Sequence, residues 1–122
     1  MAHIIPFKET TELPAARKQG RRQAKVLAFS REEFLRLISL YSMHVSGGNW
    51  RDYAVDFLPG QALFSVYRHA HEAPVLTISK QARPSGKDRE FVLYAGPKRL
   101  ARGDDLVALT PHITLAVMRQ RA

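Results

Sequence analysis

The amino-acid sequence predicts an α+β domain: a helix, an antiparallel meander of four to five strands, and a C-terminal helix, with both helices on one face of the sheet. Three observations lead to this prediction. Apolar residues recur at helical spacing after residue 30 and again after residue 105. Between these segments the apolar residues lie in short runs, joined by turns too short for parallel strand pairing. Each predicted helix has a single apolar stripe to bury, so both should cover one face of the sheet.

The first helix is predicted over residues 31–46. Ser30 and Glu33 have the spacing of a capping box, in which each side chain accepts a hydrogen bond from the other residue's backbone N–H. Gly47-Gly48 favours the end of the helix, because glycine tolerates a left-handed cap. The apolar stripe of this helix consists of Phe34, Leu37, Ile38, Tyr41 and Val45.

After the two glycines the apolar period changes to two, which is typical of strands. The first strand runs through Tyr53, Val55 and Phe57, and Pro59-Gly60 then supplies a turn. Phe64 and Val66 continue the apolar set, so the two segments form a hairpin. Further strands are expected over residues 75–80 and 90–95, followed by a short segment around Leu100.

The chain returns to helical spacing near its end, where Leu106, Leu109, Ile113 and Val117 fall on one face. Asp104 or Asp105 can cap this segment. Pro111 lacks a backbone N–H and disfavours a helix interior. Two forms are therefore expected: a short turn over 105–109 followed by a helix to about 120 with Thr110 as its N-cap, or one kinked helix.

The chain has 122 residues, 45% of them hydrophobic, which fits one small domain, predicted over residues 29–122. Residues 1–28 are predicted to form a flexible basic arm, because they have no apolar period and little to bury. The absence of cysteine excludes a disulfide scaffold, a thiol enzyme and a Cys-ligated zinc site. The chain contains no run of about 18 apolar residues, so no membrane span is predicted. Without an apolar signal-peptide region, a cytoplasmic protein is expected.

The charge balance is the strongest compositional signal, with a formal net charge of +8. Residues 1–29 contain six basic and two acidic side chains, and residues 83–102 contain the same numbers. The rest of the chain is neutral. This distribution indicates a polyanionic partner. The alternative is that the protein is basic only for solubility.

Motifs for catalysis are weak. There is no glycine-rich phosphate loop and no Gly-x-Ser-x-Gly nucleophile elbow. His69 and His71, with Glu72, are the one metal-like cluster, but no third ligand lies nearby and a turn is typical of solvated histidines. No metal and no cofactor are expected, and a non-enzymatic protein is favoured. A small metal-dependent hydrolase at these three residues is a third hypothesis.

The densest candidate site is Trp50-Arg51-Asp52-Tyr53, with Tyr67-Arg68 on the hairpin partner. Aromatic rings beside arginines are typical of grooves that bind single-stranded nucleic acid. We expect Arg68 to pair with Asp52 or Asp56 across the strands. The alternative is that Trp50 closes the end of the core and the charge pairs fix the strand register.

Two basic segments extend this candidate surface. Five cations between Arg17 and Lys25 suit phosphates, although the segment contains no aromatic side chain and the alternative is a solvated linker. The leading hypothesis is a non-enzymatic nucleic-acid-binding module, and the runner-up is a protein-interaction or regulatory subunit that docks an acidic protein. The predicted nucleic-acid-binding residues are Arg17, Lys18, Arg21, Arg22, Lys25, Trp50, Arg51, Tyr53, Arg68, Lys98, Arg99 and Arg102.

Three segments carry a resemblance to a known family: Gly48 to Asp56, Ala62 to Arg68, and Glu72-Ala73-Pro74. They resemble a family of small alphaproteobacterial proteins known only as a domain of unknown function. The similarity spans about residues 29–120 and excludes the arm. The resemblance implies a bacterial cytoplasmic setting and favours Trp50 to Tyr53 as the site, but it carries over no activity and no catalytic residue.

Overall fold

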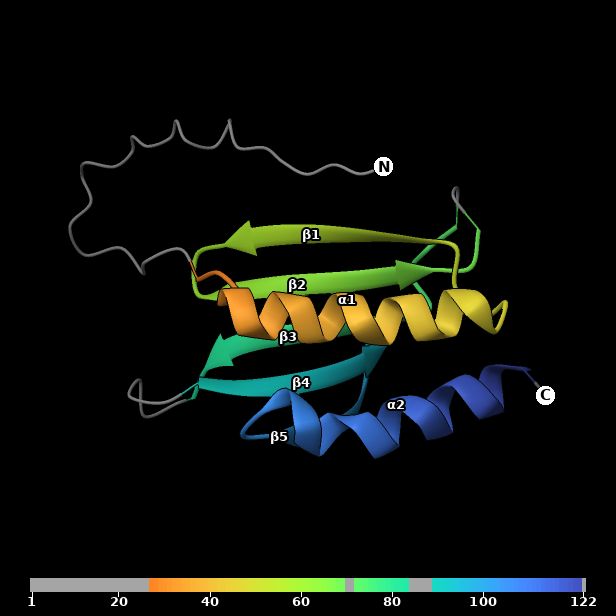
Figure 1. Ribbon diagram of the computed structural model, residues 1–122. Helices are drawn as coiled ribbons and strands as arrows, with labels where there is room; N and C mark the ends of the chain where they lie inside the picture. Colours follow the sequence, from red (N-terminus) through yellow and green to blue (C-terminus); the bar gives the residue numbers. More distant parts are fainter. Residues whose placement is uncertain (1–26, 70–71, 84–88, 122) are drawn as a thin grey trace.

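The computed structural model describes residues 27–69, 72–83 and 89–121 (Figure 1). Five strands form one antiparallel sheet in the order β1-β2-β3-β4-β5, and a helix lies at each end of the described chain. The predicted α+β meander is therefore confirmed, with five strands. The elements are α1 (Arg31–Ser46), β1 (Asp52–Leu58), β2 (Gln61–Tyr67), β3 (Leu76–Ala82), β4 (Arg89–Ala95), β5 (Lys98–Gly103) and α2 (Leu106–Arg121).

Helix α1 has the predicted bounds, and its start is the predicted capping box. The backbone N–H of Ser30 donates to Glu33 Oε1 at 2.7 Å, and the backbone N–H of Glu33 donates to Ser30 Oγ at 3.1 Å. Glu33 Oε1 also accepts from Lys80 Nζ at 2.8 Å, which ties the first turn of α1 to β3. Burial raises the pKa of Glu33, but the hydrogen bonds that Lys80 and Ser30 make to its carboxylate, together with the charge of Lys80, hold the pKa below its ordinary value.

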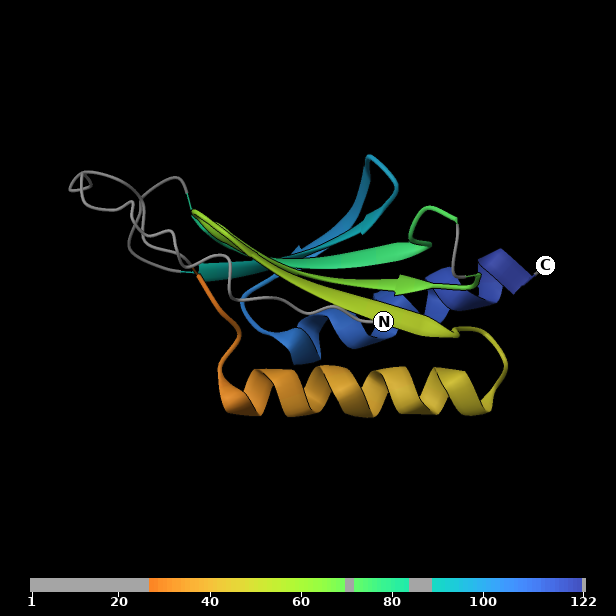
Figure 2. The ribbon, with the colours of Figure 1, turned by 90° about the horizontal axis from the view of Figure 1, so that it is seen from above.

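Both helices cover the same face of a twisted sheet, as predicted (Figure 2). Strand pairing aligns Val55 with Phe64, Phe64 with Ile78, and Ile78 with Leu93, so one row of apolar side chains crosses the sheet. Leu37 of α1 is fully buried in the same core cluster. From α2 the cluster receives Leu106, Leu109, Ile113, Ala116 and Val117.

Helix α2 is one helix that includes Pro111, so the expectation of a separate turn over 105–109 is wrong. Asp105, not Thr110, caps its start: the backbone N–H of Ala108 donates to Asp105 Oδ1 at 3.0 Å. Proline removes one helical hydrogen bond. Because five apolar side chains of α2 are buried against the sheet, packing keeps the helix continuous through that position.

The junction between β5 and α2 is tightly packed at Gly103. A Cβ placed on Gly103 would lie 2.7 Å from the Cβ of Ala108 in the first turn of α2. Glycine is therefore favoured here because the Ala108 methyl group occupies the space that a side chain at residue 103 would need.

We predict that Gly103→Ala lowers the free energy of unfolding by about 1 to 3 kcal/mol, as overpacking generally does. Urea denaturation of the Gly103→Ala, Ala108→Gly and double variants tests this. Since Ala108→Gly removes the clashing methyl, the double variant should lose less stability than the two single losses combined. Additive losses would show that the clash is not the cause.

Candidate functional site

Trp50 is buried in the core, which contradicts its predicted role as a surface for stacking bases, and Tyr53 is half-buried with its ring packed against the core. Only 3% of Trp50 is exposed, and its ring centroid lies 4.4 Å from that of His44. The Tyr53 ring lies 4.9 Å from Tyr41 and 5.2 Å from Phe64. The physical reason is that burial of a large aromatic ring outweighs its use as a half-exposed platform. The alternative interpretation, in which Trp50 closes the end of the core, fits this geometry.

The two arginines next to these rings are at the surface. Arg51 is exposed, and its backbone N–H donates to the carbonyl of Tyr67 at 2.7 Å. Arg68 is half-buried. Within the described ranges no ion pair joins Arg68 to Asp52 or Asp56, so that expected charge pair is absent. A surface hollow of about 570 Å³ is nevertheless lined by Val45, Gly48, Trp50, Arg51, Asp52 and His69.

His44 is a buried polar group beside Trp50. It is 8% exposed, and its Nε2 atom has no hydrogen-bond partner among the residues that the structure describes. Burial lowers the pKa of His44, because the charged imidazolium loses its hydration. The neutral imidazole therefore acts as a flat, nearly apolar partner of the indole.

The second face of the sheet is covered by neither helix, and we call it the open face. Strand pairing assigns two central rows of side chains to it. One row is Ala54, Ser65, Thr77, Tyr94 and Arg99, and the next is Asp56, Leu63, Ser79, Val92 and Arg102.

The centre of the open face is a network of polar side chains, two of which are buried. The hydroxyls of Ser65 and Thr77 lie 3.2 Å apart. Ser79 Oγ lies 3.0 Å from the side-chain oxygens of both Gln61 and Gln81. Ser65 and Ser79 are only 6% and 0% exposed, so their hydroxyls hold the middle strands in order and are not themselves presented to solvent.

An irregularity in β5 places two arginines on the open face. Arg99 and Arg102 are three residues apart, so in a regular strand their side chains would point to opposite faces. The register shifts between Leu93 and Tyr94, which pairs Tyr94 with Arg99 and Val92 with Arg102 and leaves Leu100 as the extra residue. Leu100 and Ala101 both pack against the core. The bulge therefore aims both guanidinium groups away from the helices.

A buried carboxylate holds one of these arginines in place. Glu90 is the first residue of β4 whose side chain lies on the open face, and it is 5% exposed. Its Oε1 lies 3.3 Å from Arg102 Nη2 and 3.5 Å from Arg83 Nη1, and Arg83 also pairs with Asp104. The side chain of Arg102 remains 51% exposed. Glu90 thus orients a guanidinium that still faces solvent.

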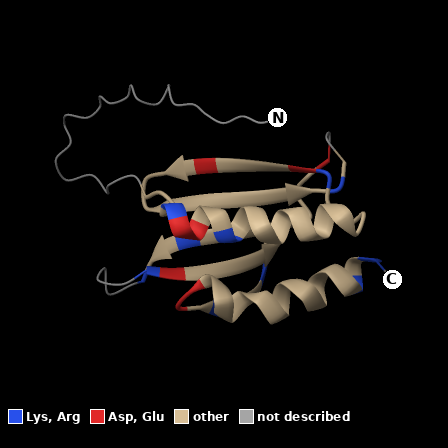
Figure 3. Ribbon diagram, in the orientation of Figure 1, with Lys and Arg blue, Asp and Glu red and all other residues tan. Residues whose placement is uncertain are grey.

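The open face has opposite charges at its two edges. Arg99 and Arg102 lie on β5, whereas Asp52 and Asp56 lie on β1 (Figure 3). Burial raises the pKa of the Tyr67 hydroxyl, and the charges of Asp56 and Asp52 raise it further. Negative charge thus dominates the β1 side, and an anionic ligand is favoured only at the β4–β5 side.

The remaining predicted cations do not all join this surface. Lys98 is exposed at the start of β5, next to Arg99, whereas Arg68 follows β2, three strands away from β5. Arg17, Lys18, Arg21, Arg22 and Lys25 lie outside the described residues, as does most of the predicted arm.

The metal hypothesis gains no support from the described part of the chain. His69 is exposed, and His71 lies outside the described residues. Among the residues that the structure covers, no group of three His, Asp or Glu side chains has the geometry to hold a metal ion. None of the described helices is long and apolar enough to cross a membrane.

Fold and surface together define an α+β protein whose meander sheet is covered by helices on one face and open on the other. The chain belongs to the family described as "Protein of unknown function (DUF2794)", which matches residues 27–109. The resemblance to a domain of unknown function is thereby confirmed, but the match ends at residue 109 and not near 120, so it leaves out most of the arm and all of α2 after its first turn. No curated protein and no solved structure matched the chain.

His44 generates a prediction about pH. Since burial lowers its pKa in the folded state below the value of about 6.5 in the unfolded state, the unfolded state binds the proton first as pH falls. Stability contributed by neutral His44 is present above about pH 6.5 and is lost as pH falls below it. We predict that His44→Leu flattens this loss, and that at about pH 7.5 it leaves stability unchanged or raises it by about 1 kcal/mol.

Urea denaturation at several pH values between about 7.5 and 5 checks this prediction. His112→Gln is the control, because it also removes one histidine but at an exposed position on α2. Identical pH dependence in wild type and His44→Leu would contradict the assignment.

Proposed function

We propose that this protein is a non-enzymatic nucleic-acid-binding module that holds a single strand on the β4–β5 side of its open face. The observation that carries the proposal is the pairing of Tyr94 with Arg99, one row from an Arg102 that is oriented by buried Glu90. A half-buried phenol ring offers a face for one base, and the two guanidinium groups suit phosphates or base edges.

The proposed surface differs from the one expected from the sequence in its aromatic part. Tyr94 replaces Trp50, which is buried, and Tyr53, whose ring packs against the core. Arg99 and Arg102 are retained, with Lys98 beside them. The basic residues between Arg17 and Lys25 would add phosphate contacts and strengthen binding without selecting a sequence.

A second candidate function is docking of an acidic protein, and the position of β5 favours it. Among the described strands β5 pairs only with β4, so one side of its backbone is available to an added strand. Its exposed side chains Lys98, Arg99 and Arg102 would suit an acidic segment. The two candidates use the same cations and differ in the ligand.

Titration of labelled single-stranded and duplex oligonucleotides with the full chain tests the proposal. Affinity for the single strand should fall as salt rises from about 50 to 200 mM, because phosphate contacts release counterions. We predict that Arg99→Gln with Arg102→Gln weakens binding about tenfold and reduces the salt slope by about 0.7 per lost phosphate contact. Tyr94→Leu should cost about 1 to 3 kcal/mol of binding free energy and Tyr94→Phe much less.

The matched control is Arg31→Gln with Arg36→Gln, which removes the same charge from the helical side of the molecule. It should change affinity far less than the β5 variant. No affinity at about 50 mM salt, or an equal loss in both double variants, would overturn the proposal. A co-purifying acidic protein that survives nuclease treatment and is released by Arg99→Gln with Arg102→Gln would favour the second candidate.

A further inference from the structure

Helix α2 has a second apolar stripe that faces away from the sheet. Val107, Leu115 and Met118 are exposed by 55%, 44% and 58%. At about 3.6 residues per turn, these three fall on one side of the helix and the five buried residues on the other. Pro111 is also exposed and lies on the same side as the stripe. A helix that is apolar on both sides usually has a second partner.

Charge is confined to the two ends of this stripe. Asp104 and Asp105 immediately precede α2, and Arg119 and Arg121 lie in its last turn, with the helix between them uncharged (Figure 3). The helix therefore combines an apolar centre with an acidic start and a basic end. When two such helices pack antiparallel, the acidic start of each lies beside the basic end of the other.

We propose that a second copy of this chain docks on α2 with its own α2 antiparallel, related by a twofold axis near the middle of the helix. Such an interface uses the same patch on both subunits. Val107 of each copy then lies against Met118 of the other, and Leu115 lies close to the axis. The acidic start of α2 in each copy, where Asp105 caps the helix, then lies at the same end of the contact as the basic last turn of the other copy. A parallel pairing would bring like charges together at both ends.

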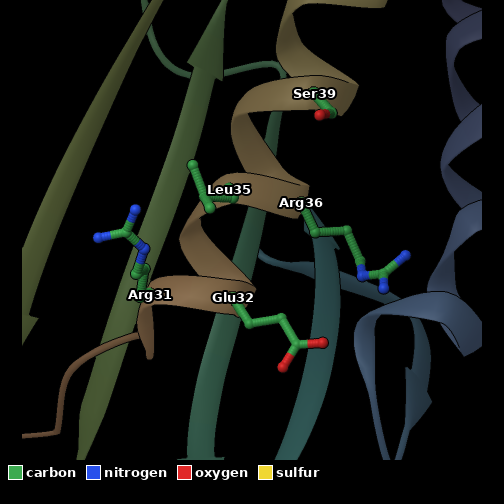
Figure 4. Close-up of a pocket in the computed structure, with 5 residues that line it drawn as sticks. All are labelled: Arg31, Glu32, Leu35, Arg36 and Ser39. Carbon is green, nitrogen blue, oxygen red and sulfur yellow. The ribbon is translucent and has the colours of Figure 1, made fainter.

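The outer surface of α1 is a poorer candidate for this contact. Leu35 is 53% exposed, but Arg31, Glu32 and Arg36 surround it in a hollow of about 550 Å³ (Figure 4). All the residues that line this hollow come from α1 alone. Burying it would remove three charged side chains from water, which is costly without matched partners. The uncharged stripe of α2 has no such penalty.

The proposed dimer is independent of the proposed function. It uses the helical side of the molecule, so both open faces remain accessible on opposite sides of the dimer. The family match ends at residue 109, before Leu115 and Met118, so the inference concerns this chain and not the family as a whole. The surface area buried by one pair of helices is smaller than the roughly 1,600 Å² of a standard interface, so we expect a dissociation constant in the micromolar range.

Sedimentation equilibrium of the full chain, up to about 500 µM, tests the proposal, since a micromolar dimer is populated there. Wild type should reach the dimer mass. Leu115→Glu with Met118→Glu should raise the dissociation constant at least tenfold, with an unchanged helical circular-dichroism spectrum. The matched control, Leu35→Glu with Met43→Glu, adds the same charge to exposed positions of α1 and should leave the dimer intact.

The orientation is tested by single cysteines, because the natural chain has none. Under oxidation a mixture of the Val107→Cys and Met118→Cys proteins should form a disulfide-linked dimer. Each protein alone should remain largely unlinked, because like positions lie at opposite ends of an antiparallel pair.

Three results would overturn the proposal. One is a chain that remains monomeric at about 500 µM, because a second copy would then not be the partner of the stripe. Another is a dimer that the α2 double variant does not weaken. The third is cross-linking of each cysteine protein with itself, which indicates parallel helices. If the chain dimerises but binds no nucleic acid, this result would contradict only the proposed function.

Discussion

The constraint on which the structure depends is that a five-stranded antiparallel sheet has two faces, and in this chain the larger continuous row of apolar side chains lies on only one of them. Phe64, Ile78 and Leu93 form a row that the two helices bury together. The opposite row contains Ser65 and Thr77, which bond to each other. Both helices must therefore lie on one side, and the other side remains available for a ligand.

A single extra residue in β5 gives the open face its positive edge. Without the bulge at Leu100, Arg99 and Arg102 would point to opposite faces, and one of them would meet the helices. Leu100 and Ala101 are both drawn to the core, and this burial stabilises the irregularity. The buried carboxylate of Glu90 then fixes Arg102. Packing on one face thus determines the chemistry on the other.

The sequence was sufficient for the fold because its signals are local: a capping box at Ser30, alternation in the strands and short turns. It was ambiguous at Pro111, since the loss of one hydrogen bond competes with tertiary packing that no local pattern reveals. It was misleading at Trp50, because an aromatic ring beside an arginine is equally typical of a binding groove and of a core edge. A signal for the face now proposed was present: Arg99 and Arg102 enclose two apolar residues, a spacing that puts both arginines on one face of a strand only where the strand has a bulge.

The central claim is that the open face, at its β4–β5 side, is the working surface of the molecule. Amide NMR shifts measured during titration with a single-stranded oligonucleotide test it most directly, since they locate the contact without substitutions. The account predicts the largest changes at Thr77, Tyr94, Arg99 and Arg102, with little change in α1. Changes confined to the helical layer, or no changes at low salt, would contradict it.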